Sequence, residues 1–124
     1  MIDASYPCIF CSIINKEINA SLVAENNSVV AFHDINPAAG IHILIIPKVH
    51  IRSVNNLAPE HASVVGDMLM MAQELARRFQ LGENGYRLVI NTESGAGQSV
   101  FHLHVHFLAG GDFSWPPGTS RPNT

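Results

Sequence analysis

Apolar residues recur at helical spacing in two segments of the chain. The longer segment covers residues 59–79, where the repeating apolar positions are Val65, Met68, Leu69, Ala72, Leu75, Ala76 and Phe79. Proline at its start, two arginines near its end and a glycine just beyond are typical of a helix. Its methionines indicate packing in the core or at a dimer interface. The shorter segment, residues 10–18, predicts a short helix with one buried face.

Five other segments have the length and the residue types of strands. They cover residues 22–25, 29–33, 42–47, 86–91 and 100–108. A turn at Asn26 and Asn27 joins the first two, and the third is a continuous apolar run that is typical of a buried central strand. Five strands, one long helix, one short helix and short connections predict an α+β fold with a mainly antiparallel, five-stranded sheet.

The composition of the whole chain narrows this picture further. Its 124 residues, 47% of them apolar, fit a single domain with a core from about residue 8 to 109 and an irregular tail over 110–124. No apolar run reaches membrane-spanning length and the start does not resemble a secretory signal, so we expect a soluble, cytoplasmic protein with no membrane partner. A net charge of −3 with scattered Lys and Arg argues against nucleic acid and favours a small phosphate ligand.

Histidines alternate with apolar residues in the last predicted strand. His102, His104 and His106 share one face of residues 100–108, and the residues between them face the other way. Surface histidines on an amphipathic strand would be the simplest explanation for one of them. Three in strict alternation instead indicate a functional site. A metal centre and phosphoryl chemistry both remain open from the strand alone.

The loop before this strand favours phosphoryl chemistry. Gly95 and Gly97 permit positive φ angles and a close approach of backbone amides to an anion, and Gln98 and Ser99 follow directly. The glycines by themselves would fit a hairpin turn equally well. Next to three histidines, the loop predicts a phosphate cradle.

Four longer motifs carry a resemblance to a known family. They are Gly-Gln-Ser-Val-x-His-x-His-x-His at residues 97–106, Asp-Ile-Asn-Pro at 34–37, His-Ile-Leu-Ile-Ile-Pro-Lys-Val-His-Ile at 42–51 and Trp-Pro-Pro-Gly at 115–118. In their order and spacing along the chain they resemble the histidine triad family, and most closely its Hint branch of nucleotide-binding hydrolases. The similarity extends from Cys8 to about Gly118.

The resemblance implies a hydrolase of nucleoside 5′-phosphoramidates. His104 would attack the α-phosphorus, and water would then release the nucleoside monophosphate from a nucleotidyl-histidine intermediate. His106 would contact the phosphate oxygens and Ser99 would help the leaving group depart. His42 and His102 would support the triad.

The resemblance also implies the residues that bind the nucleotide, with an AMP-like purine nucleotide as the ligand. Asp34 would accept hydrogen bonds from the ribose hydroxyls. The phosphate contacts would come from Asn91, Gly97, Gln98 and Ser99. The apolar slot for the purine base would consist of Ile9, Phe10, Ile13, Phe32 and Ile35.

Cys8 and Cys11 form a Cys-x-x-Cys pair that is too short in sequence to close a useful disulfide loop. Reduced thiols, half of a metal site and a redox pair are the alternatives. The resemblance adds His50 and His102, since some relatives hold structural zinc with such a set. We expect no cofactor to be required for catalysis and any zinc to be structural.

Several features leave the finer function open. Gly40 and residues 109–112 depart from the family's usual sequence beside the site. The segment around Trp115 resembles one that reaches toward a partner subunit, which implies a homodimer. Alternative functions are a dinucleoside polyphosphate hydrolase or nucleotidyl transferase, a nucleotide-binding regulatory protein with incidental catalysis, and a metalloenzyme centred on the triad.

Overall fold

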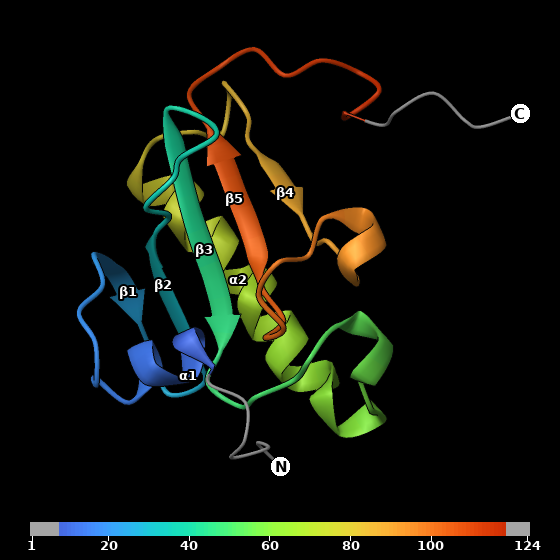
Figure 1. Ribbon diagram of the computed structural model, residues 1–124. Helices are drawn as coiled ribbons and strands as arrows, with labels where there is room; N and C mark the ends of the chain where they lie inside the picture. Colours follow the sequence, from blue (N-terminus) through green and yellow to red (C-terminus); the bar gives the residue numbers. More distant parts are fainter. Residues whose placement is uncertain (1–7, 119–124) are drawn as a thin grey trace, which may run out of the picture.

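The computed structural model describes residues 8–118 and has a single five-stranded sheet between two helices (Figure 1). The strands lie in the order β1-β2-β3-β5-β4, and every neighbouring pair is antiparallel. The expected α+β class and antiparallel sheet are therefore confirmed. The bounds are α1 Ile9–Ile14, β1 Leu22–Glu25, β2 Val29–His33, β3 Ile41–Pro47, α2 Ala62–Arg78, β4 Arg87–Val89 and β5 Val105–Ala109.

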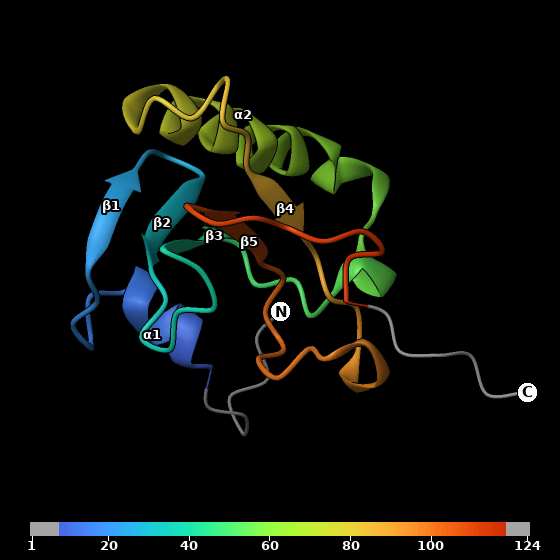
Figure 2. The same cartoon turned by 90° about the horizontal axis from the view of Figure 1, so that it is seen from above.

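The two helices cover opposite faces of the sheet, as Figure 2 shows. Successive strand residues point to opposite faces, so Ile43 and Ile45 of β3 join a large apolar cluster with α2. Leu44 and Ile46 join a smaller cluster with Phe10 of α1. The same alternation places His42 and His106 on the α1 face, because they pair with Leu108 and Leu44 in the β3–β5 ladder.

Helix α2 differs in detail from the predicted stripe. Residues 59–61 form a 3-10 turn, so the α-helix begins at Ala62. Leu69, predicted to lie in the core, is exposed, and Met71 is buried in its place. Met68, Ala72, Leu75 and Ala76 are buried as expected, and Met71 lies three positions after Met68 on the same helix face.

The short helix and two strands are shorter than predicted. Helix α1 stops at Ile14 because Lys16 takes a left-handed conformation (φ 62°), which leaves Ile18 exposed. Strand β4 covers three residues of the predicted 86–91. Strand β5 begins at Val105 and not at residue 100, since the preceding chain turns to the segment after β3, where the Leu103 amide donates to the Ile51 carbonyl oxygen.

The predicted irregular tail, residues 110–124, is described only as far as residue 118, because residues 1–7 and 119–124 lie outside the described residues. Residues 110–118 contain neither helix nor strand. Within residues 8–118, neither helix is long and apolar enough to cross a membrane.

Candidate active site

Four of the predicted catalytic histidines gather on the α1 face of the sheet. His42 lies on β3, His106 on β5, and His102 and His104 on the extended segment that leads into β5. The rings of His104 and His106 lie 5.0 Å apart, and those of His42 and His106 lie 5.1 Å apart. The expected separation of faces already holds before β5 begins, because Leu103, like Val105 within the strand, is buried in the α2 cluster.

The hydrogen bonds of His104 fix its tautomer. Its Nδ1 lies 2.7 Å from the His102 carbonyl oxygen, which can only accept, so Nδ1 carries the proton. Nε2 therefore keeps a free lone pair. Burial lowers the pKa of His104, although the hydrogen bond to His102 and the charge of Asp34 oppose this effect. A neutral imidazole with one free nitrogen is a competent nucleophile near pH 7.

A second chain of hydrogen bonds fixes the tautomers of His42 and His106. The Ala38 amide donates to His42 Nδ1 over 2.9 Å, so the His42 proton sits on Nε2 and is donated to His106 Nδ1 over 2.9 Å. His106 then carries its proton on Nε2, where it can donate to a ligand. Burial, followed by the nearness of His104 and His42, lowers the pKa of His106 to about 4.

Asp34 lies beside this pair, with its Oδ2 atom 3.4 Å from His42 Nε2. It sits after β2, where its Oδ1 atom also accepts from the Asn36 amide in a turn. The carboxylate is partly exposed. It therefore stabilises the turn and can also accept a hydrogen bond from a ligand at the edge of the site. The predicted ribose contact remains a prediction.

The loop formed by residues 91–99 lies on the α1 side of the sheet, where it is the orange turn in Figure 2. Gly97 has a φ of 94°, and a Cβ atom there would lie 3.8 Å from the Asn91 side-chain nitrogen. Ser99 is exposed. Asn91 and Gly97 therefore lie side by side, while the phosphate cradle with Ser99 remains a prediction.

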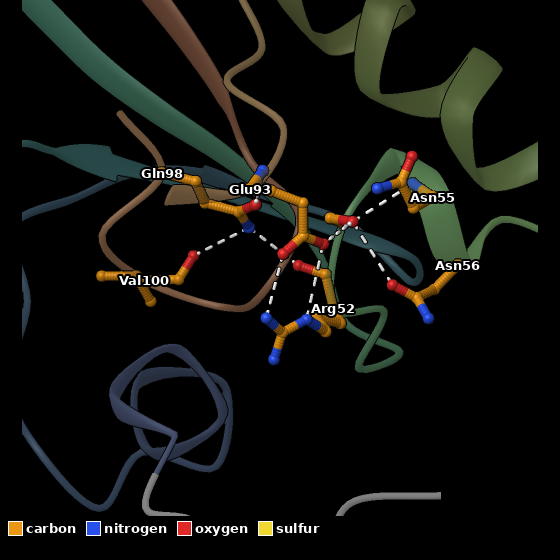
Figure 3. Close-up of polar contacts among 7 residues, drawn as sticks. Arg52, Asn55, Asn56, Glu93, Gln98 and Val100 are labelled. Carbon is orange, nitrogen blue, oxygen red and sulfur yellow. Dashed lines mark hydrogen bonds and ion pairs between the residues drawn. The ribbon is translucent and has the colours of Figure 1, made fainter. Parts of the chain in front are cut away.

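Gln98 is placed differently from our expectation of a phosphate contact. Its side chain is buried, and its Oε1 atom accepts from the Glu93 amide over 2.7 Å. Its Nε2 atom donates to the carbonyl oxygens of Arg52 (2.8 Å) and Val100 (3.1 Å), as Figure 3 shows. With both amide protons and the oxygen engaged inside the protein, the side chain favours a structural role in the loop.

The predicted base slot divides into core and surface residues. Phe10, Ile13 and Phe32 are buried in the α1 cluster, where the Phe10 ring lies 5.5 Å from that of Phe32 and 5.2 Å from that of His104. Ile9 and Ile35 are exposed. Two of the five apolar side chains are thus open to a ligand and the other three belong to the core, and the base slot remains a prediction.

The four predicted metal ligands come together although they are distant in sequence. The donor atoms of Cys8, Cys11, His50 and His102 lie within 4.8 Å of one another. The Nδ1 atoms of His50 and His102 are 3.2 Å apart, the Cys8 sulfur lies 3.4 Å from His102 Nδ1, and the Cys11 sulfur lies 3.3 Å from His50 Nδ1 and 3.6 Å from His102 Nδ1. Tetrahedral zinc, with bonds of about 2.0 Å to nitrogen and about 2.3 Å to sulfur, requires ligand separations of about 3.3 to 3.8 Å.

The hydrogen bond of His102 also fits a metal. His102 donates from Nε2 to the Pro47 carbonyl oxygen over 2.8 Å, so its Nδ1 lone pair faces the thiols. Burial lowers the pKa of His102 to about 4, which keeps this imidazole neutral, whereas burial and the Cys8 side chain raise the pKa of the Cys11 thiol to about 12, so a metal would have to displace the thiol proton. One buried and one half-buried imidazole beside two thiols form a set that zinc binds.

The two departures from the family's usual sequence face each other. A Cβ atom at Gly40 would lie 3.0 Å from the Gly110 carbonyl oxygen, and Gly110 has a φ of 80°. They flank Ile41 and Ala109, the last pair of the β3–β5 ladder. Beyond Gly110 the tail meets the side chain of Arg87 on β4, which donates to the Ser114 carbonyl oxygen over 2.9 Å and lies over the Phe113 ring. Trp115 is exposed.

Three residues beside the site had no counterpart in our sequence-based expectations. Glu93 accepts from Arg52 Nη2 over 3.0 Å and from Ser53 Oγ over 2.8 Å (Figure 3). Ser53 is fully buried. The sequence offers no signal for this cluster, because an ion pair between residues 41 positions apart has no local pattern.

Comparison with known proteins agrees with this geometry. The HIT domain model matches residues 15–113. The purine nucleoside phosphoramidase of Escherichia coli is 43% identical over 82% of this chain and 86% of its own length, and a 14 kDa zinc-binding protein of Zea mays is 46% identical over 90% and 88%. A HIT family hydrolase from Legionella pneumophila has a crystal structure that superposes with a TM-score of 0.88 at 45% identity, covering 90% of this chain and all of that one. The chain belongs to the HIT domain family.

Proposed function

We propose that this HIT-family hydrolase cleaves nucleoside 5′-phosphoramidates of the AMP-amine type, with His104 as the nucleophile. The observation that carries the proposal is the 2.7 Å hydrogen bond from His104 Nδ1 to the His102 carbonyl oxygen, which leaves Nε2 free to attack. The relative that is 43% identical and is a purine nucleoside phosphoramidase supports this choice of substrate.

In the first step, His104 Nε2 forms a bond to the α-phosphorus and the bond from phosphorus to the amine breaks. The amine takes up one proton from the solvent as it leaves, with the Ser99 hydroxyl beside it. His106 donates from Nε2 to a phosphate oxygen, and the amides of the loop at residues 91–99 support the developing negative charge. In the second step, water attacks phosphorus, His104 is released and one proton is given off. The net reaction consumes one water molecule.

Asp34, Ile9 and Ile35 recognise the nucleoside in this proposal. The Asp34 carboxylate accepts from the ribose hydroxyls, because a carboxylate oxygen pair suits two neighbouring donors. Ile9 and Ile35 are exposed, so a purine base that packs on them would cover apolar surface that is now open to water.

Cys8, Cys11, His50 and His102 form the structural zinc site of this proposal. When bound, zinc would link α1 to the segments after β3 and before β5 without taking part in the reaction. The donor set leaves no ligand position for substrate, because four protein ligands complete a tetrahedron.

The proposed assembly is a homodimer that joins at the β4 edge of the sheet. Beside this edge, α2 and the neighbouring segments form an apolar hollow of about 240 Å³ whose lining includes Val54, Leu69 and Ile90, all exposed. An open sheet edge next to exposed apolar side chains is unfavourable in water. Sedimentation should find a dimer for the wild type and a monomer for Ile90→Glu; a monomeric wild type contradicts the assembly.

The test of the function is to trap the intermediate. Incubation with adenosine 5′-phosphoramidate, an acid-free quench and peptide mass spectrometry should detect an adenylyl group on His104 and AMP in solution. Parallel incubation with a diadenosine polyphosphate separates the alternative hydrolase. Faster turnover of the dinucleotide, or binding of AMP with no turnover of either compound, contradicts the proposed function.

A further inference from the structure

We propose that Glu93 and Arg52 form a clamp that holds the phosphate loop, residues 91–99, in the position from which Ser99 and the loop amides act. This makes Glu93 a positioning residue for the reaction, and it rests on the proposed function for the meaning of that position. The contacts of the clamp, drawn in Figure 3, join the loop to the segment after β3.

The backbone of Glu93 takes a conformation that glutamate rarely adopts. Its φ is 69° and its ψ is 167°, a region of the backbone map occupied almost entirely by glycine. The chain therefore has an unfavourable residue at the beginning of the 3-10 turn Ser94–Ala96. Such a conformation persists only where surrounding contacts hold it, so the side chain must supply something that glycine could not.

The carboxylate of Glu93 is held by the segment after β3. One oxygen accepts from Arg52 Nη2 over 3.0 Å, and the other accepts from Ser53 Oγ over 2.8 Å and lies 3.5 Å from Arg52 Nε. Ser53 is fully buried, so one of the three contacts is fixed to the interior of the protein. The hydrogen bonds from Arg52 and then Ser53 lower the pKa of Glu93, which keeps the carboxylate charged.

The backbone of Glu93 organises the far end of the same loop. Its carbonyl oxygen accepts from the amides of Ala96 and Gln98, each over 3.1 Å, and its own amide donates to Gln98 Oε1 over 2.7 Å. Gln98 in turn donates to the carbonyl oxygens of Arg52 and Val100. Ser99 thus lies between Gln98 and Val100, which are joined by the hydrogen bond from the Gln98 side-chain amide to the Val100 carbonyl oxygen.

Arg52 extends the clamp toward the triad. Its guanidinium lies 4.2 Å from the centre of the Phe101 ring, and Phe101 directly precedes His102. Arg52 therefore makes three contacts. Its guanidinium binds Glu93 in the loop and lies over Phe101 in the triad segment, and its carbonyl oxygen accepts from Gln98 at the end of the loop. Since exposed ion pairs add little to stability, positioning is a better reason for this arrangement than folding.

The experiment combines amide hydrogen exchange with steady-state kinetics on the full chain. Glu93→Gln keeps the shape of the side chain and removes its charge. Exchange of the amides of residues 94–99 should quicken by about tenfold, and kcat for adenosine phosphoramidate should fall by about tenfold while KM changes less than about twofold. Arg52→Gln should do the same. The double variant should be no slower than the slower single variant, because both remove one interaction.

Glu25→Gln is the matched control. Glu25 is 31% exposed against 34% for Glu93, and it also accepts from two cations, Lys16 (2.7 Å) and Lys48 (2.9 Å). It lies on β1, on the opposite edge of the sheet from β4, and its variant should keep wild-type kcat and loop exchange.

Three results would overturn the clamp: wild-type loop exchange in Glu93→Gln, additive losses of kcat in the double variant, or an equal loss of kcat in Glu25→Gln. Failure of the proposed function is distinguishable, because a wild-type protein that releases no AMP leaves the exchange measurement unaffected.

Discussion

The two faces of the sheet share the same strands but are covered very differently. Helix α2, with 17 residues, closes one face over a continuous apolar cluster. Helix α1, with six residues, covers only part of the other face and leaves His106 partly exposed beside His42 and His104. Strand β5 contributes side chains to both faces, because Phe107 is buried under α2 and His106 points to the candidate site. We infer that the closed face stabilises the fold and that the half-open face carries the proposed catalytic histidines.

The strongest test of this division is removal of the nucleophile. His104→Ala should lower AMP release by at least about 10³-fold, because loss of a nucleophile removes the covalent path altogether. The midpoint of thermal unfolding should change by only a few degrees. His33→Ala is the control, since His33 is an exposed histidine whose partner Ile43 points to the α2 face. Near wild-type release by His104→Ala would contradict the assignment.

The closed face should respond in the opposite way. Leu75 of α2 is fully buried, so Leu75→Ala should lower the free energy of unfolding by about 2 to 5 kcal/mol. Below the unfolding transition, kcat of the folded protein should stay within about twofold of wild type. Urea denaturation and kinetics at low temperature measure the two quantities, with exposed Met70→Ala as the control. A large fall in kcat without loss of stability would show that α2 also shapes the site.

The sequence predicts the closed face better than the open one. Alternation along the strands and the stripe of α2 follow from local periodicity, so Phe107, Met68 and Leu75 fall in the core as expected. The prediction for Leu69 is wrong because Leu69 and Met71 lie on opposite edges of the apolar stripe, and periodicity does not say toward which edge the buried face is turned. The predicted range of β5 is too long, because periodicity reports which way a side chain points and not whether a neighbouring strand provides hydrogen bonds.

On the open face, the motifs locate the histidines and the cysteines, and the fold brings them together. Their tautomers could not be predicted, since these depend on the Ala38 amide and the carbonyl oxygens of Pro47 and His102. The sequence allows Gln98 a phosphate contact because its side chain can reach in either direction from the loop. Its partners, Glu93 and the carbonyl oxygen of Arg52, become neighbours only in the folded chain.

The pH dependence of activity tests whether the open face keeps its histidines neutral. Burial lowers the pKa of His104 below 6.5 and that of His106 to about 4. The neutral forms are the active ones, so kcat/KM should be level from pH 8 to about pH 6.5 and fall by up to about tenfold per pH unit further down. The acid limb should have an apparent pKa below 6.5. A midpoint at or above that value would mean that water reaches the site more freely.

The free energy of unfolding should depend on pH over the same range, in which His104 and His106 gain protons. In the unfolded chain these histidines bind protons near pH 6.5, whereas in the folded protein they do so only at lower pH. Their contribution to the free energy of unfolding is therefore fully present above about pH 6.5 and is lost as the pH drops toward 4. Urea midpoints at about pH 7 and about pH 5 measure this effect. His106→Asn should reduce the difference between the two midpoints, and an unchanged difference would assign it to other groups.

Two glycines should show the smallest changes in stability and activity: Gly66 on α2 and Gly40 directly before β3. Gly66 is exposed on α2, and a methyl group added there would have nothing within 4 Å, so Gly66→Ala should stabilise the protein by about 0.5 to 1 kcal/mol through helix propensity. At Gly40 the same methyl would lie 3.0 Å from the Gly110 carbonyl oxygen, and the backbone must move to admit it.

Gly40→Ala should therefore destabilise the protein by about 1 kcal/mol, in line with the cost of crowding a packed position. Because Gly40 lies between Ala38 and His42, the same shift should disturb the 2.9 Å hydrogen bond that fixes the His42 tautomer, and kcat should fall by a few-fold. Gly66→Ala should leave kcat unchanged. Thermal unfolding and kcat are measured on both variants. If Gly40→Ala loses stability but keeps full kcat, the end of the β3–β5 pair contributes only to packing and does not fix the tautomer of His42.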